Sequence, residues 1–225
     1  MKPLQECRLY AFVDTSYLHG RRPQQIAAQL CAGGADLIQL RAKGASKDEV
    51  RQMAEAILPV TRRANVGLII NDHLDIAIET GADGCHLGQE DFFGGGHTRV
   101  SELFAGQAGK SFPNSKVRIG LSTHSPGQAL EAHGAGADYL GIGPVYSTGT
   151  KPQAKPVTLQ YVRWAAGHLL ATIPWFAIGG IDLGNLDDVL AAGATRICVV
   201  SAILNAEDLT AACRAFKERL CFPKL

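Results

Sequence analysis

Residues 66–91 read VGLIINDHLDIAIETGADGCHLGQED: a strand-like segment, a helical segment and a second strand-like segment in succession. The first is the apolar run at 66–70, and a helical pattern of apolar residues follows between 74 and 78. The chain then returns through Gly-Ala-Asp to a buried-looking segment at 84–91. This order predicts a βαβ unit with parallel strands. Parallel α/β proteins bind ligands at the carboxyl ends of their strands, so the polar residues that follow each strand are the first candidates for a site.

Two acids occupy such positions, Asp72 after the first strand and Asp91 after the second. Consecutive parallel strands would deliver both carboxylates to the same rim. Carboxylate oxygens suit Mg²⁺, which keeps several waters and often joins one or two carboxylates to substrate phosphates. Asp is also common as a helix N-cap and in loops. The alternatives are therefore that Asp72 caps a helix and that Asp91 is a loop residue. The magnesium hypothesis therefore depends on what the other strands bring to the rim.

The same alternation of strand and helix patterns continues through the whole chain. We expect further strands at 9–13, 37–41, 117–121, 139–143, 175–178 and 197–200, and further helices at 24–32, 47–63, 126–133, 159–170, 186–192 and 206–219. A Gly-rich insertion at about 94–116 contains a short helix at about 99–104. The pattern amounts to eight strand–helix units.

A short repeat supports a closed barrel. Gly-Ala-Asp precedes the even-numbered strands at 34–36, 81–83 and 136–138, with Gly-Ala-Thr at 193–195 as a variant. Glycine is expected where a helix ends and the chain turns back. Such a repeat is hard to fit to a doubly wound open sheet, and 225 residues is a typical length for a barrel. The sequence therefore predicts an α/β protein, a single-domain (β/α)8 TIM barrel spanning residues 1–225 without a domain boundary.

Composition limits the partners of this protein. The formal net charge is +1, so no global field favours nucleic acid or an anionic membrane. No apolar stretch approaches the roughly 20 residues of a transmembrane helix, and the amino terminus lacks the pattern of a signal peptide. The six cysteines include no C-x-x-C pair, which indicates reduced thiols. We expect a cytoplasmic protein that acts on small molecules, with homo-oligomerisation left open.

Basic residues follow the strand at 37–41. Alternation along the strand places Gln39, Arg41 and Lys43 on the side that faces the barrel mouth. A guanidinium and an ammonium at neighbouring inward positions can hold a di- or polyphosphate. A solvated Arg/Lys pair is the alternative. Because the residues before Arg41 are apolar, however, an inward guanidinium would be partly buried and would need an anion.

The strand at 117–121 is followed by a polar segment, Ser122-Thr123-His124-Ser125. Ser125 and Pro126 have the pattern of a helix start. This leaves Ser122 and His124 without a structural duty. His124 fits a proton carrier and a packing residue equally well.

The last three strand ends carry candidate phosphate ligands. The loop at 143–152 supplies Thr148, Thr150 and Lys151, which suit a phosphate-gripping lid, although its composition also fits an ordinary surface loop. Gly179-Gly180 follows the seventh strand and Val200-Ser201 the eighth. Barrels of this type often bind phosphate through main-chain N–H groups at these two positions, where glycine allows close approach. Two anion sites beside a metal site suggest two phosphorylated substrates, one of them a diphosphate.

Motifs along nearly the whole chain resemble the thiamine phosphate synthase family. The matching segments are Gln39-Leu40-Arg41-x-Lys43, Asn71-Asp72, His86-Leu87-Gly88-Gln89-x-Asp91, Gly120-x-Ser122-Thr123-His124-Ser125, Asp138-Tyr139-Leu140-Gly141-x-Gly143-Pro144-Val145, Thr148-x-Thr150-Lys151, Ala177-Ile178-Gly179-Gly180-Ile181 and Val199-Val200-Ser201-Ala202-Ile203. Each motif is weak by itself, and the ordered set is highly specific.

The resemblance implies a transferase that couples 4-amino-2-methyl-5-hydroxymethylpyrimidine diphosphate with 4-methyl-5-(2-phosphoethyl)thiazole, or its carboxylate, giving thiamine phosphate and pyrophosphate. It implies that Mg²⁺ is held by Asp72 and Asp91. It assigns the pyrimidine diphosphate to Gln39, Arg41, Lys43, Asn71, Ser122 and Lys151, with catalytic roles for Arg41, Lys43, Ser122 and Lys151. It assigns the thiazole phosphate to Thr148, Thr150, Gly180, Val200 and Ser201.

This chain departs from the family pattern in two places. Ala42 stands where the family usually has Glu, which bears on affinity for the pyrimidine, and the insertion at 94–116 is longer than usual. Two other functions stay open. One is a thiazole tautomerase that uses a histidine such as His124, and the other is a catalytically silent barrel that binds thiamine intermediates as a regulator. We would not expect a tautomerase to carry the complete set of diphosphate and Mg²⁺ ligands found here.

Overall fold

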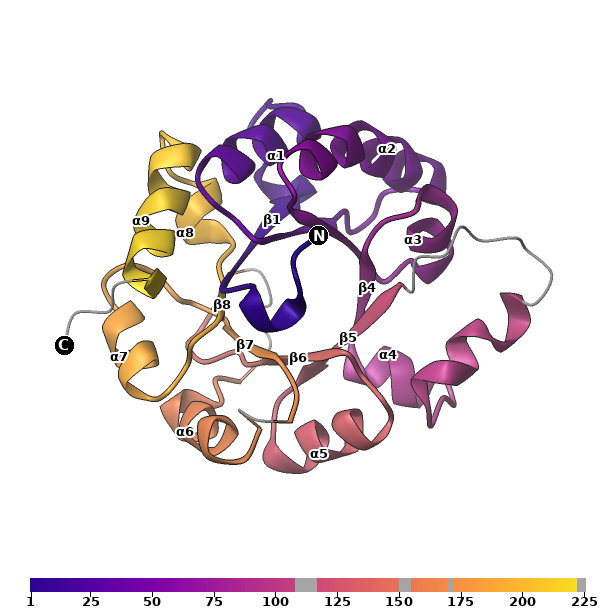
Figure 1. Ribbon diagram of the computed structural model, residues 1–225, viewed down its shortest axis with the longest axis vertical. Coiled ribbons are helices and arrows are strands. Elements are labelled where there is room, and N and C mark those ends of the chain that lie inside the picture. The colour runs from indigo at the N-terminus through magenta and orange to yellow at the C-terminus, as the bar shows by residue number, and fades with distance from the viewer. Residues whose placement is uncertain (108–116, 150–154, 170–171, 222–225) are drawn as a thin grey trace.

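Eight parallel strands close into a barrel in which each strand pairs with the next and β8 pairs with β1 (Figure 1). This computed structural model describes residues 1–107, 117–149, 155–169 and 172–221. The strands are β1 (Leu9–Asp14), β2 (Leu37–Arg41), β3 (Gly67–Asn71), β4 (Gly84–Leu87), β5 (Arg118–Thr123), β6 (Tyr139–Ile142), β7 (Trp175–Ile178) and β8 (Ile197–Cys198). The predicted (β/α)8 barrel is confirmed.

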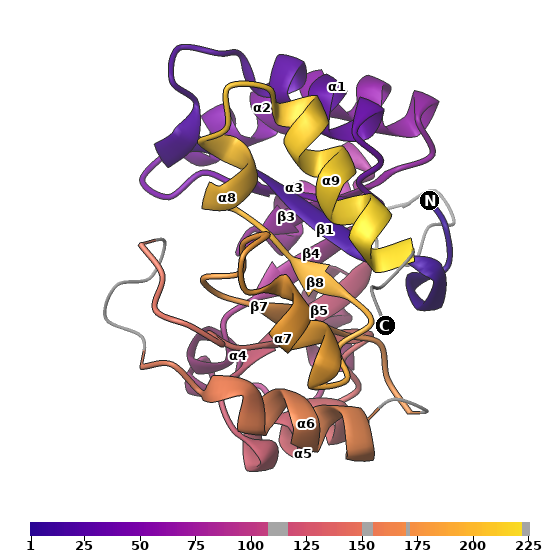
Figure 2. The same cartoon turned by 90° about the vertical axis from the view of Figure 1, so that its left-hand side faces the viewer.

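Helices surround the strands on the outside of the barrel (Figures 1 and 2). The α-helices are α1 (Pro23–Ala32), α2 (Lys47–Arg63), α3 (Leu74–Thr80), α4 (Gln89–Gly94), α5 (Pro126–Gly134), α6 (Thr158–His168), α7 (Leu186–Ala191), α8 (Ser201–Leu204) and α9 (Leu209–Cys221). Short 3-10 helices are η1 (Leu4–Glu6), η2 (Thr15–Tyr17) and η3 (Val100–Gln107). η3 is the short helix expected in the insertion, of which residues 108–116 lie outside the described part.

Two helices were missed by the sequence patterns. α4 begins at Gln89, inside the segment expected to end the fourth strand, and α8 begins at Ser201, directly after the predicted end of the eighth strand. They contain six and four residues, too few to display a 3.6-residue period. β8 ends at Cys198, two residues earlier than predicted. By contrast, β2, α2 and β7 have the predicted bounds.

The Gly-Ala-Asp repeat fastens the amino ends of neighbouring strands. In each copy the Asp main-chain N–H donates to the carbonyl of a residue at the start of the preceding strand, and the carboxylate accepts from the N–H of that same residue. The pairs are Asp36 with Leu9, Asp83 with Leu68 and Asp138 with Ile119, with N···O distances of 2.8–3.0 Å. The glycine of each copy has a positive φ, between 71° and 92°. The repeat is therefore a turn followed by a clamp between two strands.

Aromatic rings fill the centre of the barrel. Tyr10, Tyr139 and Phe176 are buried and pack with ring centroids 5.4–6.0 Å apart. Gly120 leaves room for them, because a Cβ at this position would lie 2.1 Å from Cζ of Tyr139. Two of these rings carry hydroxyl groups, so the interior of the barrel is not wholly apolar.

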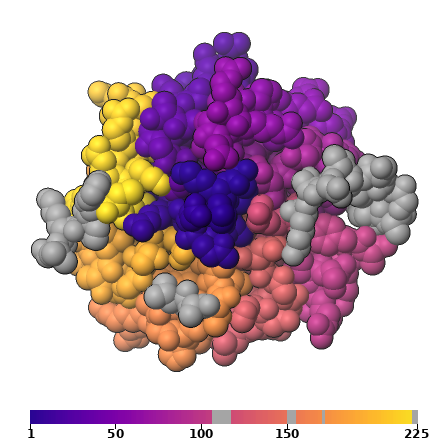
Figure 3. Space-filling view, viewed as in Figure 1, coloured from indigo at the N-terminus to yellow at the C-terminus, as the bar shows by residue number. Residues whose placement is uncertain are grey.

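The amino-terminal segment covers one mouth of the barrel. Its residues, drawn in indigo, lie over the barrel centre in Figures 1 and 3. Leu4 and Cys7 are buried, and Nζ of Lys2 is 2.8 Å from Oδ1 of Asp36. These contacts lie at the amino ends of the strands. The mouth formed by the carboxyl ends is opposite, and Figure 2 shows the segment that follows β6 at that end.

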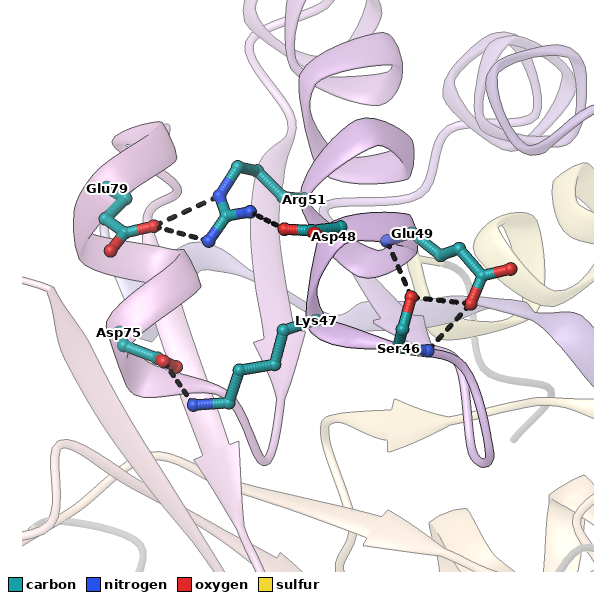
Figure 4. Close-up of polar contacts among 7 residues, drawn as sticks. All are labelled: Ser46, Lys47, Asp48, Glu49, Arg51, Asp75 and Glu79. Carbon is teal, nitrogen blue, oxygen red and sulfur yellow. Dashed lines mark hydrogen bonds and ion pairs between the residues drawn. The ribbon is translucent and has the colours of Figure 1, made fainter.

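A row of ion pairs joins the β2–α2 segment to the β3–α3 segment. The pairs are Lys43–Asp72, Lys47–Asp75 and Arg51–Glu79, with N···O distances of 2.5, 2.5 and 3.0 Å. Figure 4 shows the second and third pairs beside the capping box at the start of α2, where Ser46 and Glu49 bond each other's main-chain N–H groups. The two basic residues within α2, Lys47 and Arg51, are four apart, about one helical turn. Exposed pairs of this kind contribute little stability.

The six cysteines are free thiols, as predicted. Burial raises the pKa of Cys31 to about 11, so this thiol stays protonated at neutral pH. None of the helices formed by the described residues has the length and apolarity needed to span a bilayer.

The clamp at Asp36 is expected to be the costliest to remove. Its side chain is 0% exposed and accepts from two main-chain N–H groups as well as from Lys2 and Lys217. We predict that Asp36→Ala lowers the free energy of unfolding by about 3 kcal/mol, because a buried donor is left unpaired and two ammonium groups lose their partner. Urea denaturation at pH 7 measures this. The comparison is Asp83→Ala, for which we expect about 1 kcal/mol because that carboxylate is 26% exposed.

The Asp36 contribution should also depend on pH. Burial opposes its ionisation, but the hydrogen bonds from Lys2, Lys217 and the main chain outweigh burial and hold the pKa of Asp36 below the ordinary 3.8. A depressed pKa stabilises the folded state fully above the unfolded value and progressively less as pH falls through the folded value. The stability gap between wild type and Asp36→Ala should therefore shrink below about pH 4. An unchanged gap at pH 3 would show that the charge of Asp36 does not matter.

Candidate active site

A cavity opens at the carboxyl-terminal mouth of the barrel, and all eight strands contribute to its wall. It holds about 930 Å³ of empty space, part of it continuous with solvent. Predicted substrate-binding residues that line it are Gln39, Arg41, Asn71, Ser122, Thr148, Gly180, Val200 and Ser201. Residues separated by more than 150 positions in the sequence therefore share one cavity. The predicted ligands Thr150 and Lys151 lie outside the described residues.

Arg41 faces this cavity, as strand alternation predicts, and it has an internal anion that the sequence did not reveal. Its Nη1 is 2.7 Å from Oδ2 of Asp14, which is 0% exposed. Asp14 ends β1 and is the register partner of Arg41 on β2. The carboxylate of Asp14 is thus the anion that a partly buried Arg41 requires, and it is present without substrate. This pairing holds the guanidinium in the cavity wall before any substrate arrives.

Lys43, Asp72 and Asp91 lie outside the cavity wall, on the rim formed by the ends of β2, β3 and β4. The ammonium of Lys43 pairs with Asp72, as described above. Asp72 extends the β3–β4 ladder, since its N–H donates to the carbonyl of His86 at 2.9 Å. The N-cap of α3 is His73, so the alternative of Asp72 as the helix cap is wrong.

Asp91 lies in the first turn of α4 and not in a loop. Its carboxylate folds back over the end of β4, because a Cβ at Gly88 would lie 2.5 Å from Oδ2 of Asp91. A carboxylate in the first turn of a helix interacts favourably with the helix dipole. Asp72 therefore follows β3 directly, and Asp91 lies in the first turn of the helix that follows β4.

The two carboxylates fit the Mg²⁺ ion that the family resemblance implies. They offer oxygen atoms only, which hard cations prefer. The described residues contain no group of three or more His, Cys, Asp or Glu side chains placed to hold a metal. A structural zinc site would need such a group. Mg²⁺ does not, because waters and substrate phosphates complete its coordination when one or two carboxylates are available.

A chain of hydrogen bonds crosses the floor of the cavity, and sequence reasoning missed its central members. Nε2 of His86 is 3.0 Å from Oγ of Ser122, and Nδ1 of His86 is 3.2 Å from the Tyr139 hydroxyl. The Tyr139 hydroxyl is 3.1 Å from that of Tyr10, which accepts from Nε2 of Gln39 at 2.7 Å. Ser122 therefore does have a structural partner. A polar residue alternating with Cys85 and Leu87 in β4 was the available signal for His86.

His124 also has a structural partner. Its Nδ1 hydrogen-bonds the carbonyl of Gly143, and its main-chain N–H donates to Gln128. Ser125 caps α5, and Pro126 occupies the first turn, as predicted. His124 lines the cavity as well, so the contact with Gly143 joins the ends of β5 and β6 at the mouth.

The glycine pair after β7 allows the segment after β6 to pack closely against the main chain. Gly179 and Gly180 have φ of 104° and 64°, and a Cβ on either would collide with Pro144, Tyr146 or Ser147. The N–H of Tyr146 donates to the Gly179 carbonyl at 3.0 Å. The pair therefore anchors the segment after β6 beside β7. Gly180 also lines the cavity, which leaves its predicted role toward phosphate open.

Comparison with known proteins agrees with this geometry. A family model described as thiamine monophosphate synthase matches residues 9–203. A protein of Halalkalibacterium halodurans named thiamine-phosphate synthase is 40% identical over 214 residues, covering 95% of each chain. A protein of the same name from Thermus thermophilus is 48% identical over 189 residues, covering 84% of each chain. The solved structure of thiamine phosphate pyrophosphorylase from Pyrococcus furiosus superposes with a TM-score of 0.82 at 30% identity, covering 97% of this chain and 98% of that one.

Similarity of this extent covers every strand of the barrel and the segments that form the mouth. The match runs from the first residue of β1 to the third residue of α8. Its limits enclose every described residue of the cavity wall and rim. This chain belongs to the thiamine monophosphate synthase family.

Proposed function

We propose that this protein is a thiamine-phosphate synthase that joins a hydroxymethylpyrimidine diphosphate to a thiazole phosphate. The observation that carries the proposal is that one cavity is lined by residues from both sets of anion ligands that the family resemblance implies. Arg41 and Ser122 belong to the first set, with Lys43 on the adjacent rim. Gly180 and Ser201 belong to the second. Two phosphorylated substrates can therefore meet in one cavity.

The first set suits the pyrimidine diphosphate. The amides of Gln39 and Asn71 match the donor and acceptor edge of an aminopyrimidine, and the charged groups match the diphosphate. Arg41 is held in position by Asp14, so little side-chain order has to be gained when the anion binds. The second set, at the ends of β7 and β8, is where barrels commonly bind a phosphate monoester.

The reaction depends more on stabilisation of the leaving pyrophosphate than on a general base. The pyrimidine amino group pushes electrons toward the CH₂–O bond, which breaks with its electron pair going to the pyrophosphate oxygen. The thiazole nitrogen then attacks the methylene carbon with its lone pair and forms the new C–N bond. Arg41, Lys43 and Lys151 stabilise the charge that grows on the departing pyrophosphate, and Ser122 donates a hydrogen bond to it.

The nucleophile is a neutral lone pair, so the reaction calls for no strong general base and no protein nucleophile. Mg²⁺, held by Asp72 and Asp91, would neutralise part of the diphosphate charge. Exclusion of water from around the bound substrates would protect the pyrimidine cation.

The coupling reaction tests the proposal directly. The purified protein, supplied with both phosphorylated substrates and Mg²⁺, should form thiamine phosphate and pyrophosphate in equal amounts, measured by chromatography. A chelator should abolish product, and added Mg²⁺ should restore it. Conversion of the thiazole alone into a double-bond isomer would indicate a tautomerase. Tight binding of one substrate without any product would indicate a silent regulatory barrel.

Variants of the rim acids test the metal assignment. We predict that Asp72→Ala and Asp91→Ala each lower kcat by about 100-fold or more, because the charge on the departing pyrophosphate is no longer neutralised. Lys151→Ala should have a similar effect. The matched control is Asp75→Ala, which removes a neighbouring acid that also pairs with a lysine but lies in helix α3 and pairs with Lys47 of helix α2. An acid whose alanine variant behaves like Asp75→Ala does not hold the metal.

A further inference from the structure

The hydrogen-bond chain on the cavity floor connects two predicted substrate-binding residues that are far apart in the sequence. It runs from Ser122 through His86, Tyr139 and Tyr10 to Gln39, and each of its four links is 2.7–3.2 Å long. Each residue comes from a different strand: β5, β4, β6, β1 and β2 in that order. Both ends line the cavity, and the two tyrosines between them are buried. A chain of this kind can have only one direction of donation at a time.

The ligand at one end determines that direction. Pyrophosphate oxygens accept hydrogen bonds and do not donate them, so Ser122 must use its O–H for the ligand. Its Oγ can then only accept, which places a proton on Nε2 of His86 and leaves Nδ1 as an acceptor. The Tyr139 hydroxyl donates to Nδ1 and accepts from the Tyr10 hydroxyl. Tyr10 in turn accepts from the amide NH₂ of Gln39.

The hydrogen bonding of Gln39, at the other end of the chain, follows from the same argument. With its NH₂ engaged by Tyr10, Gln39 has its carbonyl oxygen left for a ligand in the cavity. An acceptor at this position selects a ligand that donates, such as the exocyclic amino group of an aminopyrimidine. Had the chain run the other way, Gln39 would offer its NH₂ and would select a carbonyl group. Burial raises the pKa of Tyr10 and Tyr139 well above the usual value, so both remain hydroxyls able to relay the direction.

We infer that Tyr139, Tyr10 and His86 act as positioning residues that couple the two ends of the pyrimidine site, so that holding a pyrophosphate at Ser122 selects an amino group at Gln39. This inference rests on the proposed function, and it assigns a specificity role to side chains that do not themselves donate to the substrate. Gly120 also contributes to this hydrogen-bond chain, because only glycine leaves room for the Tyr139 ring.

A spectroscopic measurement tests the direction without any turnover. ¹⁵N NMR of histidine-labelled protein, with pyrophosphate and Mg²⁺ added, should show His86 as the neutral tautomer protonated on Nε2. The signal is assigned by its absence from the His86→Gln variant. A tautomer protonated on Nδ1, or an imidazolium, would overturn the inference.

Binding of two unreactive pyrimidines tests the coupling. The probes are 4-amino-5-hydroxymethyl-2-methylpyrimidine and its 4-oxo counterpart, titrated by calorimetry with pyrophosphate and Mg²⁺ present. Wild type should prefer the amino compound by about tenfold or more. Tyr139→Phe removes the central link and lets the Gln39 amide turn, so the preference should fall about fivefold to tenfold. Tyr10→Phe should do the same and provides a second test if Tyr139→Phe does not fold.

The matched control is Tyr161→Phe. Tyr161 is also buried, and its hydroxyl donates to Oγ1 of Thr123 at 2.8 Å, but it is not part of the chain. This variant should keep the wild-type preference. Tyrosine variants that fold and retain the full preference, in a protein that makes thiamine phosphate, would overturn the coupling alone. A wild-type protein that binds neither pyrimidine would overturn the proposed function and the coupling with it.

Discussion

All eight strands point the same way around a closed ring, and this constraint organises the molecule. Closure forces every carboxyl end to one mouth and every amino end to the other. The two mouths are built differently. Asp36, Asp83 and Asp138 fasten strand to strand at the amino ends, and the amino-terminal segment covers that opening. The other mouth carries the cavity, so binding groups can be placed there without weakening the fastening.

The site itself is prepared by pairs within the protein. Arg41 is held by Asp14, Lys43 by Asp72 and Ser122 by His86. Arg41 and Ser122 line the cavity wall, where leaving a partly buried charged or polar group unpaired is costly. The partners also fix the orientation of each group before substrate binds. Much of the order that catalysis requires is therefore present in the protein alone.

Sequence patterns predicted the framework well because it depends on local periodicity. β2, α2 and β7 have strong alternation or a long amphipathic face, and their bounds agree with expectation. α4 and α8 were missed because so few residues show no period. The strand ends also predicted which residues reach the cavity, since alternation decides the side on which Gln39 and Arg41 lie. Alternation does not predict which side chain of a neighbouring strand a residue contacts. Asp14 and the two tyrosines on the cavity floor became visible only with the strand register.

The close fit between Gly120 and the ring of Tyr139 has an evolutionary consequence. A relative with any side chain at the first position has no space for a tyrosine at the second, so the two positions should be inherited together. Loss of Gly120 would exclude the Tyr139 hydroxyl on the adjacent strand. The site would then lose a group that helps it discriminate between nitrogen heterocycles. A glycine in the middle of a strand can in this way restrict which substrates a lineage is able to adopt.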